Sequence, residues 1–340
     1  MSVYGEESSL VVRYIPVTPA ISSFVMYLSR SIVAFLPKTC FKASGRIADL
    51  LAVSFLYRVV RMPYSKMMKF YSAWSIALAL VMLIYLFYVY FSEPVEGAEA
   101  IYAMCVALFH MIYGIWFYKG RDTSVFAART IQGRTVYGVF LLVVAACTKL
   151  FHGIQLPETV WLDRVYYYAL VVGSVELFSA LITKVTLYKS DYKARQKTAS
   201  KMTFKSKNRF VFGIYLLFIG FWNLISPNTL LSFLYLPETA FSGFLGDVIS
   251  LGPMHILGVQ ILILGSYNLF AARNNLETLV EAGMRGGAIT VIFFVVLVAT
   301  GFLHPITLLL PAIDFVSIIL IVIDNQLERS EKSKFNISSR

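Results

Sequence analysis

Eight separate apolar runs, each about 17 to 24 residues long, constrain the fold of this chain more than any other feature. A helix of this length crosses the roughly 30 Å of hydrocarbon in a bilayer, at about 1.5 Å per residue. Backbone N–H and C=O groups need internal partners in hydrocarbon, so each run predicts a transmembrane helix. The runs cover residues 71–91, 99–118, 135–151, 165–187, 210–226, 252–271, 287–303 and 305–324.

The composition supports this interpretation and excludes a soluble domain. Hydrophobic residues make up 58% of the chain, with a mean hydropathy of +0.70, whereas soluble domains contain roughly 45 to 50%. The net charge of +11 comes from Lys and Arg residues in alternate loops and both termini, while loops 92–98, 152–163 and 227–251 contain none. Basic loops stay in the cytosol, so both termini are predicted to be cytosolic. Because the charge follows the loops, it does not indicate nucleic-acid binding.

Short matches between the two halves predict a duplicated four-helix unit. His110 precedes the Phe-Ala-Ala-Arg sequence at 126–129 by 16 residues, and His255 precedes the same sequence at 270–273 by 15. Three further correspondences are Thr148 with Thr300, His152 with His304, and Glu176 with Asp314. Four spans return the chain to the side of the membrane on which it started, so the second copy enters in the same orientation as the first. The predicted fold is therefore all-α and polytopic, with eight helices arranged as two parallel four-helix repeats.

The same patterns divide the chain into five segments. An N-terminal region, 1–69, is expected to lie in the cytosol or at the membrane surface, with an amphipathic helix at 44–62. A more polar stretch at 18–36 is an alternative ninth membrane element, re-entrant or spanning. The remaining segments are the first repeat at 70–187, a basic cytosolic linker at 188–209, the second repeat at 210–324, and a cytosolic tail at 325–340.

Two acidic residues near the middle of predicted spans are the first candidates for a functional site. Glu176 lies about 12 residues into the fourth span and Asp314 about 10 into the eighth. Intramembrane acids are costly, at about 2.5 to 3.5 kcal/mol for Asp at a helix centre. They are predicted either to contact a ligand or handle protons, or to tie helices together through a tyrosine. The tyrosines considered for such a tie are Tyr113, Tyr166 and Tyr167.

Histidines and arginines complete the candidate set. All four histidines, His110, His152, His255 and His304, are predicted near the non-cytosolic end and are taken as ligand-binding candidates. Their spacing does not match a metal site, so neither a metal nor a cofactor is predicted. Four arginines near the cytosolic ends of spans are candidates for headgroup or interface contacts: Arg129, Arg134, Arg273 and Arg285.

The four-span unit resembles two membrane-protein families. Tyr113-Gly114 and Gly258 in the second span, basic residues at the start of the third, and Glu176-Leu177 or Asp314-Phe315 in the fourth resemble bacterial DoxX-like proteins. The layout is also similar to the fungal family named for increased loss of mitochondrial DNA. The resemblance covers about 70–324 and implies a helical tetraspan unit in an internal membrane.

These features favour a non-enzymatic protein of the endoplasmic reticulum or another internal membrane. It is predicted to bind, or help to move, an apolar lipid-like ligand between the two bundles. One alternative is a structural or assembly protein whose acids only hold helices together. Another is a lipid-modifying enzyme, which requires Glu176 within hydrogen-bond reach of His110 or His152, directly or through water. Membrane lipids are the predicted partners, and a membrane-protein partner or a second copy of the chain stays open.

Overall fold

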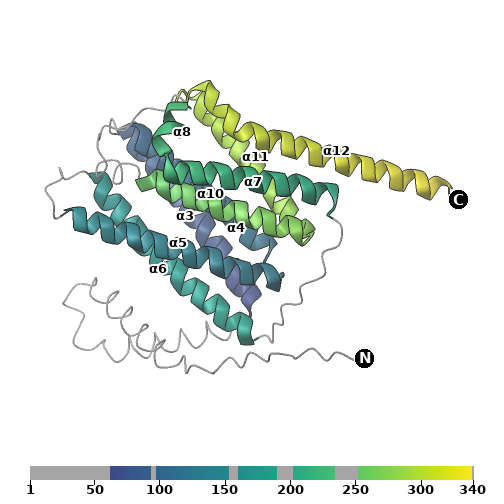
Figure 1. Cartoon of the computed structure of the whole chain (residues 1–340), viewed down its shortest axis with the longest axis horizontal. Helices are drawn as coiled ribbons and strands as arrows, with labels where there is room; N and C mark the ends of the chain where they lie inside the picture. The colour runs from purple at the N-terminus through teal and green to yellow at the C-terminus, as the bar shows by residue number, and fades with distance from the viewer. Residues whose placement is uncertain (1–61, 93–96, 153–159, 190–201, 234–251, 339–340) are drawn as a thin grey trace, which may run out of the picture. The chain divides into compact units, whose positions relative to one another are not determined.

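The described residues form eight long helices and two short ones (Figure 1). This computed structural model describes residues 62–92, 97–152, 160–189, 202–233 and 252–338. The long helices are α3 (Tyr64–Ser92), α4 (Gly97–Lys119), α5 (Ser124–His152), α6 (Val160–Lys189), α7 (Phe204–Ile225), α10 (Gly252–Arg273), α11 (Glu277–Ala299) and α12 (Leu309–Ser338). Helix α8 (Pro227–Phe233) follows α7, and the 3₁₀ helix η2 (Pro305–Leu308) precedes α12. Helices α3 to α6 are called the first half below, and α7 to α12 the second half.

All eight predicted spans are confirmed as helices long and apolar enough to cross a membrane. Two of them begin well before the apolar run: α5 begins at Ser124 and α11 at Glu277. Their first turns contain polar and small residues that lower the local hydropathy but pack inside the protein. Thr130 and Arg134 of α5 are buried, as are Ala282 and Gly283 of α11. A prediction from hydropathy alone therefore places the start of both helices too late in the sequence.

The outward faces of the helices are apolar. Val136, Val139 and Val143 lie exposed along α5, and Ile214, Phe218 and Phe221 lie exposed along α7. Their spacing of three or four residues forms one continuous stripe on each helix. A soluble protein would place polar side chains on such a face. These stripes suit hydrocarbon, in agreement with the length and hydropathy of the helices.

Helices α4 and α10 are the central pair and pack against each other and across the two halves. They are the most enclosed spans, with 78% and 72% of their residues buried. Helix α4 also packs on α11, and α10 also packs on α5. Tyr267 of α10 fits among aromatic rings of the first half, 6.3 Å from the ring of Trp116 and 5.4 Å from that of Phe126. The two halves therefore share a core instead of forming two separate bundles.

Glycines allow the outer helices to approach closely. A Cβ on Gly220 of α7 would lie 2.9 Å from the carbonyl oxygen of Gly258 in α10. The same contact recurs between α5 and α6, where a Cβ on Gly138 would lie 2.9 Å from the oxygen of Gly173. In a membrane, helices gain from close backbone packing because burying apolar surface between them gives no advantage over lipid. Figure 1 shows α7 beside α10 and α5 beside α6.

The residues that aligned the two halves do not occupy matching places. His110 is the central residue of the span Ile101–Lys119, whereas His255 is the fourth residue of α10. The sequence at 270–273 ends α10, but the identical sequence at 126–129 lies in the first turns of α5. In the first half the chain turns at 120–123, before it reaches this sequence. The duplication itself stays a prediction.

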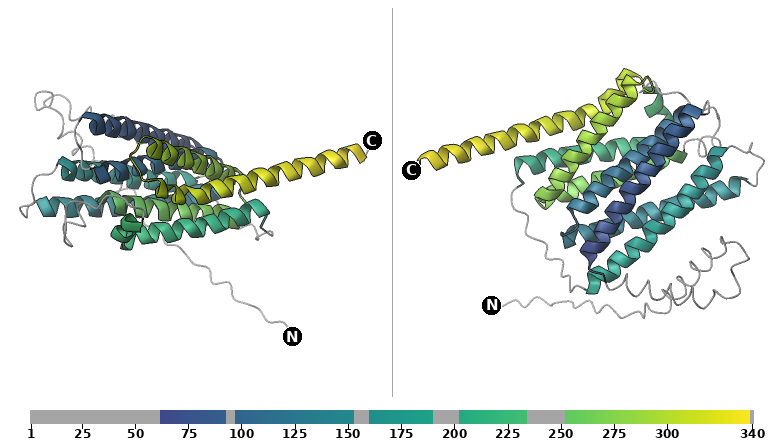
Figure 2. Two further views of the ribbon diagram at one scale, coloured as in Figure 1. Left: turned by 90° about the horizontal axis from the view of Figure 1, so that it is seen from above. Right: turned by 180° about the vertical axis from the view of Figure 1, so that it is seen from behind.

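Several sequence predictions fall on residues outside the described ones. They include the amphipathic helix at 44–62, the stretch at 18–36, and most of the basic linker. Helix α7 nevertheless starts inside the predicted linker, because Thr203 caps it by accepting a hydrogen bond from the Ser206 N–H at 3.2 Å. At the other end of the second half, the C-terminal part of α12 extends past the neighbouring helices (Figure 2).

The close contact between α7 and α10 yields a stability prediction. Replacing Gly220 with Leu should lower the free energy of unfolding by about 1 to 3 kcal/mol, because the side chain meets backbone atoms that cannot move aside. Phe221, the next residue, is 58% exposed, so Phe221→Leu should change stability by less than about 0.5 kcal/mol. Thermal unfolding in detergent measures both, and equal midpoints would contradict the prediction.

Candidate functional site

A chain of hydrogen bonds between polar side chains lies inside the protein and connects four helices. His110 Nε2 of α4 lies 2.6 Å from the Tyr168 hydroxyl of α6, which lies 2.8 Å from the Tyr137 hydroxyl of α5. Gln260 Nε2 of α10 donates to the Tyr137 hydroxyl at 2.9 Å. Tyr113 of α4 donates to the main-chain carbonyl of Gln260. The hydrogen-bond chain therefore joins both halves. It lies at mid-membrane depth, since His110 and Tyr137 are the central residues of their spans.

The donor at one end of this chain orients the rest. Because Gln260 donates to Tyr137, one order gives each hydroxyl one hydrogen bond as donor and one as acceptor. In that order Tyr137 donates to Tyr168, and Tyr168 donates to His110 Nε2. The reverse order would leave the hydrogen of the Tyr137 hydroxyl unpaired in a buried site, which is costly. In the first order His110 accepts at Nε2, which requires a neutral ring with its hydrogen on Nδ1.

A pocket of about 150 Å³ adjoins this chain at Tyr168. Helices α3, α4 and α6 form it together with the start of α10, so it lies between the two halves. Its lining is Met82, Tyr85, Leu86, Ala103, Val106, Arg164, Val165, Tyr168, Pro253 and Ile256. Tyr85 is 45% exposed, so the pocket reaches the lipid-facing surface. Arg164 is the only charged residue of the lining, and its guanidinium lies 5.4 Å from the centre of the Tyr85 ring.

Glu176 and Asp314 are buried, and each lies close to a buried arginine of its own half. Glu176 interacts electrostatically with Arg134 of α5, and Asp314 with Arg209 of α7. Neither acid makes a direct ion pair in the part of the chain that the structure describes. Neither lines the pocket. Glu176 nevertheless lies close enough to Tyr113, Tyr137 and Tyr168 of the hydrogen-bond chain to interact with them electrostatically. Asp314 has no such interaction with these tyrosines, so the two candidate acids do not share one site.

The three other histidines differ from His110 in environment. His255 is half-buried. His304 is exposed and caps η2, where its Nδ1 accepts a hydrogen bond from the Ile306 N–H at 3.3 Å. His152 is the last residue of α5, and its side chain lies outside the described residues. Within the described residues, no three His, Cys, Asp or Glu side chains are grouped as a metal ion would require.

Of the four predicted interface arginines, Arg134 departs most from the expected surface position. Its side chain is buried, with Nη2 donating to the hydroxyls of Thr130 and Thr183, both at 3.0 Å. Its guanidinium also stacks on Tyr71, 4.4 Å from the ring centre. The prediction of a headgroup contact is therefore wrong for Arg134, because helix packing encloses its end of α5.

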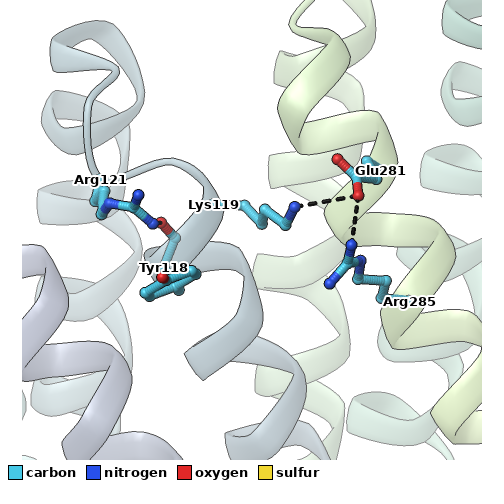
Figure 3. Close-up of polar contacts among 5 residues, drawn as sticks. All are labelled: Tyr118, Lys119, Arg121, Glu281 and Arg285. Atoms are coloured by element: carbon cyan, nitrogen blue, oxygen red, sulfur yellow. Dashed lines mark hydrogen bonds and ion pairs between the residues drawn. The ribbon is translucent and has the colours of Figure 1, made fainter.

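The other three arginines remain closer to the surface. Arg129 is half-buried and donates to Gln132, and Arg273 is exposed beside Phe210. Arg285 bonds Glu281 at 2.7 Å, and Lys119 of α4 bonds the same carboxylate oxygen at 3.1 Å (Figure 3). This exposed cluster joins α4 to α11 and so ties the two halves together at that end.

Sequence analysis missed the residues that matter most here. Tyr137, Tyr168 and Arg164 were not singled out, because tyrosine and arginine are also common at membrane interfaces. Gln260 gave a usable signal, since it is the only glutamine inside the apolar run 252–271. Tyr113 does bond, but to the Gln260 carbonyl and not to an acid.

The fold and the site together define a class of protein. Eight apolar helices with apolar outer faces describe a multi-pass α-helical membrane protein. No family model, curated protein or solved structure matches this chain. The resemblance to the DoxX-like and fungal families therefore rests on the sequence patterns alone.

The hydrogen-bond chain yields a second prediction. Tyr168→Phe removes the hydroxyl that both His110 and Tyr137 bond, so it should lower the free energy of unfolding by about 1 to 2 kcal/mol. Tyr167 is the neighbouring residue and is 54% exposed. Tyr167→Phe should therefore have an effect of less than about 0.5 kcal/mol. Chemical denaturation in detergent distinguishes the two, and a neutral Tyr168→Phe would show that the chain does not stabilise the fold.

A third prediction concerns the buried charges of the first half. Glu176→Leu leaves Arg134 without its nearby countercharge and should cost about 3 kcal/mol of stability. Adding Arg134→Met should recover at least half of that loss, since the lone charge is then removed. The measurement is a double-mutant cycle of unfolding free energies. Additive losses from the two changes would mean that the residues do not interact.

Proposed function

We propose that this membrane protein binds the hydrocarbon chain of a lipid in the pocket between α3, α4, α6 and α10. The observation that carries the proposal is an apolar pocket that reaches the lipid-facing surface between the two halves. Ligand pockets are commonly apolar with a few polar groups that fix orientation. Here those groups are Arg164 and Tyr168.

The size and chemistry of the pocket define the kind of ligand. A volume of about 150 Å³ accommodates about five groups the size of a water molecule. It therefore holds part of one acyl chain, with the rest of the lipid remaining in the bilayer. The proposed ligand is therefore a lipid, held by one chain in the pocket.

The two alternatives receive less support. An enzyme would need a carboxylate beside a histidine, but the His110 ring bonds Tyr168 and the Glu176 atom Oε2 has no hydrogen-bond partner among the described residues. A purely structural protein needs no pocket open to lipid. The positive charge of alternate loops supports cytosolic termini, and an internal membrane such as the endoplasmic reticulum remains the proposed location.

A pair of alanine substitutions tests the proposal. Ala103 lines the pocket, so Ala103→Leu should fill it and reduce the amount of co-purified lipid at least about tenfold. Ala77 lies exposed on α3, so Ala77→Leu adds the same atoms on the lipid-facing surface and should leave binding unchanged. Native mass spectrometry of the purified proteins measures bound lipid directly.

The possible outcomes separate the hypotheses. Loss of lipid only in Ala103→Leu supports the pocket. Equal lipid in both variants would place binding elsewhere. A parent protein that carries no lipid under these conditions would contradict the proposal and favour the structural alternative.

A further inference from the structure

Polar residues line the contact between α7 and α12, away from the pocket. The two helices pack in opposite directions, so rising residue numbers on α7 face falling numbers on α12. We call this contact the α7–α12 seam. Its members are Lys205, Asn208, Arg209 and Tyr215 of α7, and Leu310, Asp314, Ser317 and Asp324 of α12.

Direct contacts hold the seam together on both sides of Arg209. Lys205 lies 3.8 Å from Asp324. One turn further along, Asn208 donates to the Ser317 carbonyl at 3.0 Å and to its hydroxyl at 3.1 Å. Deeper in the membrane, the Tyr215 hydroxyl donates to the Leu310 carbonyl at 3.1 Å. The seam is therefore polar from the first turn of α7, at Lys205, to near the middle of the span, at Tyr215.

Arg209 lies between these contacts and is the exception. Its side chain is 1% exposed, and all three guanidinium nitrogens have no hydrogen-bond partner among the described residues. Asp314 is close enough to interact with it electrostatically, but the two do not form a direct ion pair in the described part of the chain. A buried guanidinium without hydrogen bonds is strongly unfavourable, since each donor loses its water.

Helix α11 forms a third wall of the site through Gly283 and Gly287, which lie against Arg209 and Asp314. A Cβ on Gly283 would lie 3.1 Å from Arg209 Nη1, and a Cβ on Gly287 would lie 2.6 Å from Asp314 Oδ1. The α11 backbone is occupied by its own helical hydrogen bonds. A small molecule that enters the seam would supply the acceptors that Arg209 lacks among the described residues.

The charges of the seam identify that molecule. Lys205 and Arg209 carry two positive charges, and Asp314 and Asp324 carry two negative charges. The seam is thus neutral overall, which favours neither a metal cation nor an anionic lipid headgroup. Water can accept from the guanidinium and donate to the carboxylate at once, and it fits a narrow polar space.

We propose that water enters the α7–α12 seam from its Lys205 and Asp324 end and hydrates Arg209 and Asp314 inside the membrane. At that end Lys205 and Asp324 keep part of their side chains accessible, 19% and 22% respectively. Asp314 is then in contact with the aqueous phase on the side of the C-terminal tail. The seam gives an intramembrane carboxylate one-sided access to solvent, a property that the lipid pocket does not need.

Cysteine labelling tests this proposal. In a protein with Cys40, Cys105 and Cys147 replaced by Ser, Ser317→Cys places a thiol in the seam and Val316→Cys places one on the lipid-facing surface. A charged methanethiosulfonate reagent reacts with thiolate, which forms in water and not in hydrocarbon. In sealed vesicles, Ser317→Cys should react at least about tenfold faster than Val316→Cys, and only from the side of the C-terminal tail.

Two further results make the test decisive. Adding Arg209→Met to Ser317→Cys should slow labelling, because an apolar side chain no longer holds water in the seam. Equal rates for Ser317→Cys and Val316→Cys, or labelling from the opposite side, would overturn the proposal.

If Ser317→Cys does not fold, hydroxyl-radical footprinting of the unsubstituted protein replaces it. Tyr215 should then be oxidised more than the lipid-facing Phe218, and the reverse order would overturn the proposal.

Discussion

The contact between α4 and α10 is the constraint on which the rest of this structure depends. A span that carries polar side chains needs neighbouring helices around it if those groups are to stay out of lipid. Helices α4 and α10 obtain such neighbours by packing on each other, while α4 also packs on α11 and α10 on α5. The outer helices then complete the enclosure through glycine contacts. The hydrogen-bond chain, the pocket and the aromatic setting of Tyr267 all lie along this central pair.

The buried polar groups of this protein differ in how many hydrogen-bond partners they have. Four helices each contribute a group to the His110 chain, in which Gln260 Oε1 alone has no partner among the described residues. The buried charges are satisfied less completely, since Arg134 and Arg209 lie near acids without contacting them directly. Such groups are costly in hydrocarbon, and in membrane proteins they commonly mark functional positions. The pocket and the seam are accordingly the two distinct places where we propose that this protein binds a lipid and water.

Much of the fold could be predicted from the sequence, because a bilayer imposes one length and one hydropathy on every span. The eight spans were found within a few residues, except where polar turns of α5 and α11 pack inward. The site could not be predicted in the same way. Matching histidines suggested equivalent places, yet His110 and His255 differ in depth and burial, since a short shared sequence does not fix a position within a helix. Which tyrosine bonds His110 depends on helix rotation and tilt, and these follow from packing that no single segment encodes.

The shared core has a consequence for the order of assembly. The ribosome releases α4 and α5 well before α10, because chains emerge from their N-terminal end. Until α10 enters the membrane, the surface that Tyr267 covers on Trp116 and Phe126 has no native neighbour, and Tyr113 lacks its acceptor at Gln260. The first four helices therefore reach their native packing only after α10 has entered the membrane. A chain truncated before residue 252 would insert its early spans and still leave their centre unfinished.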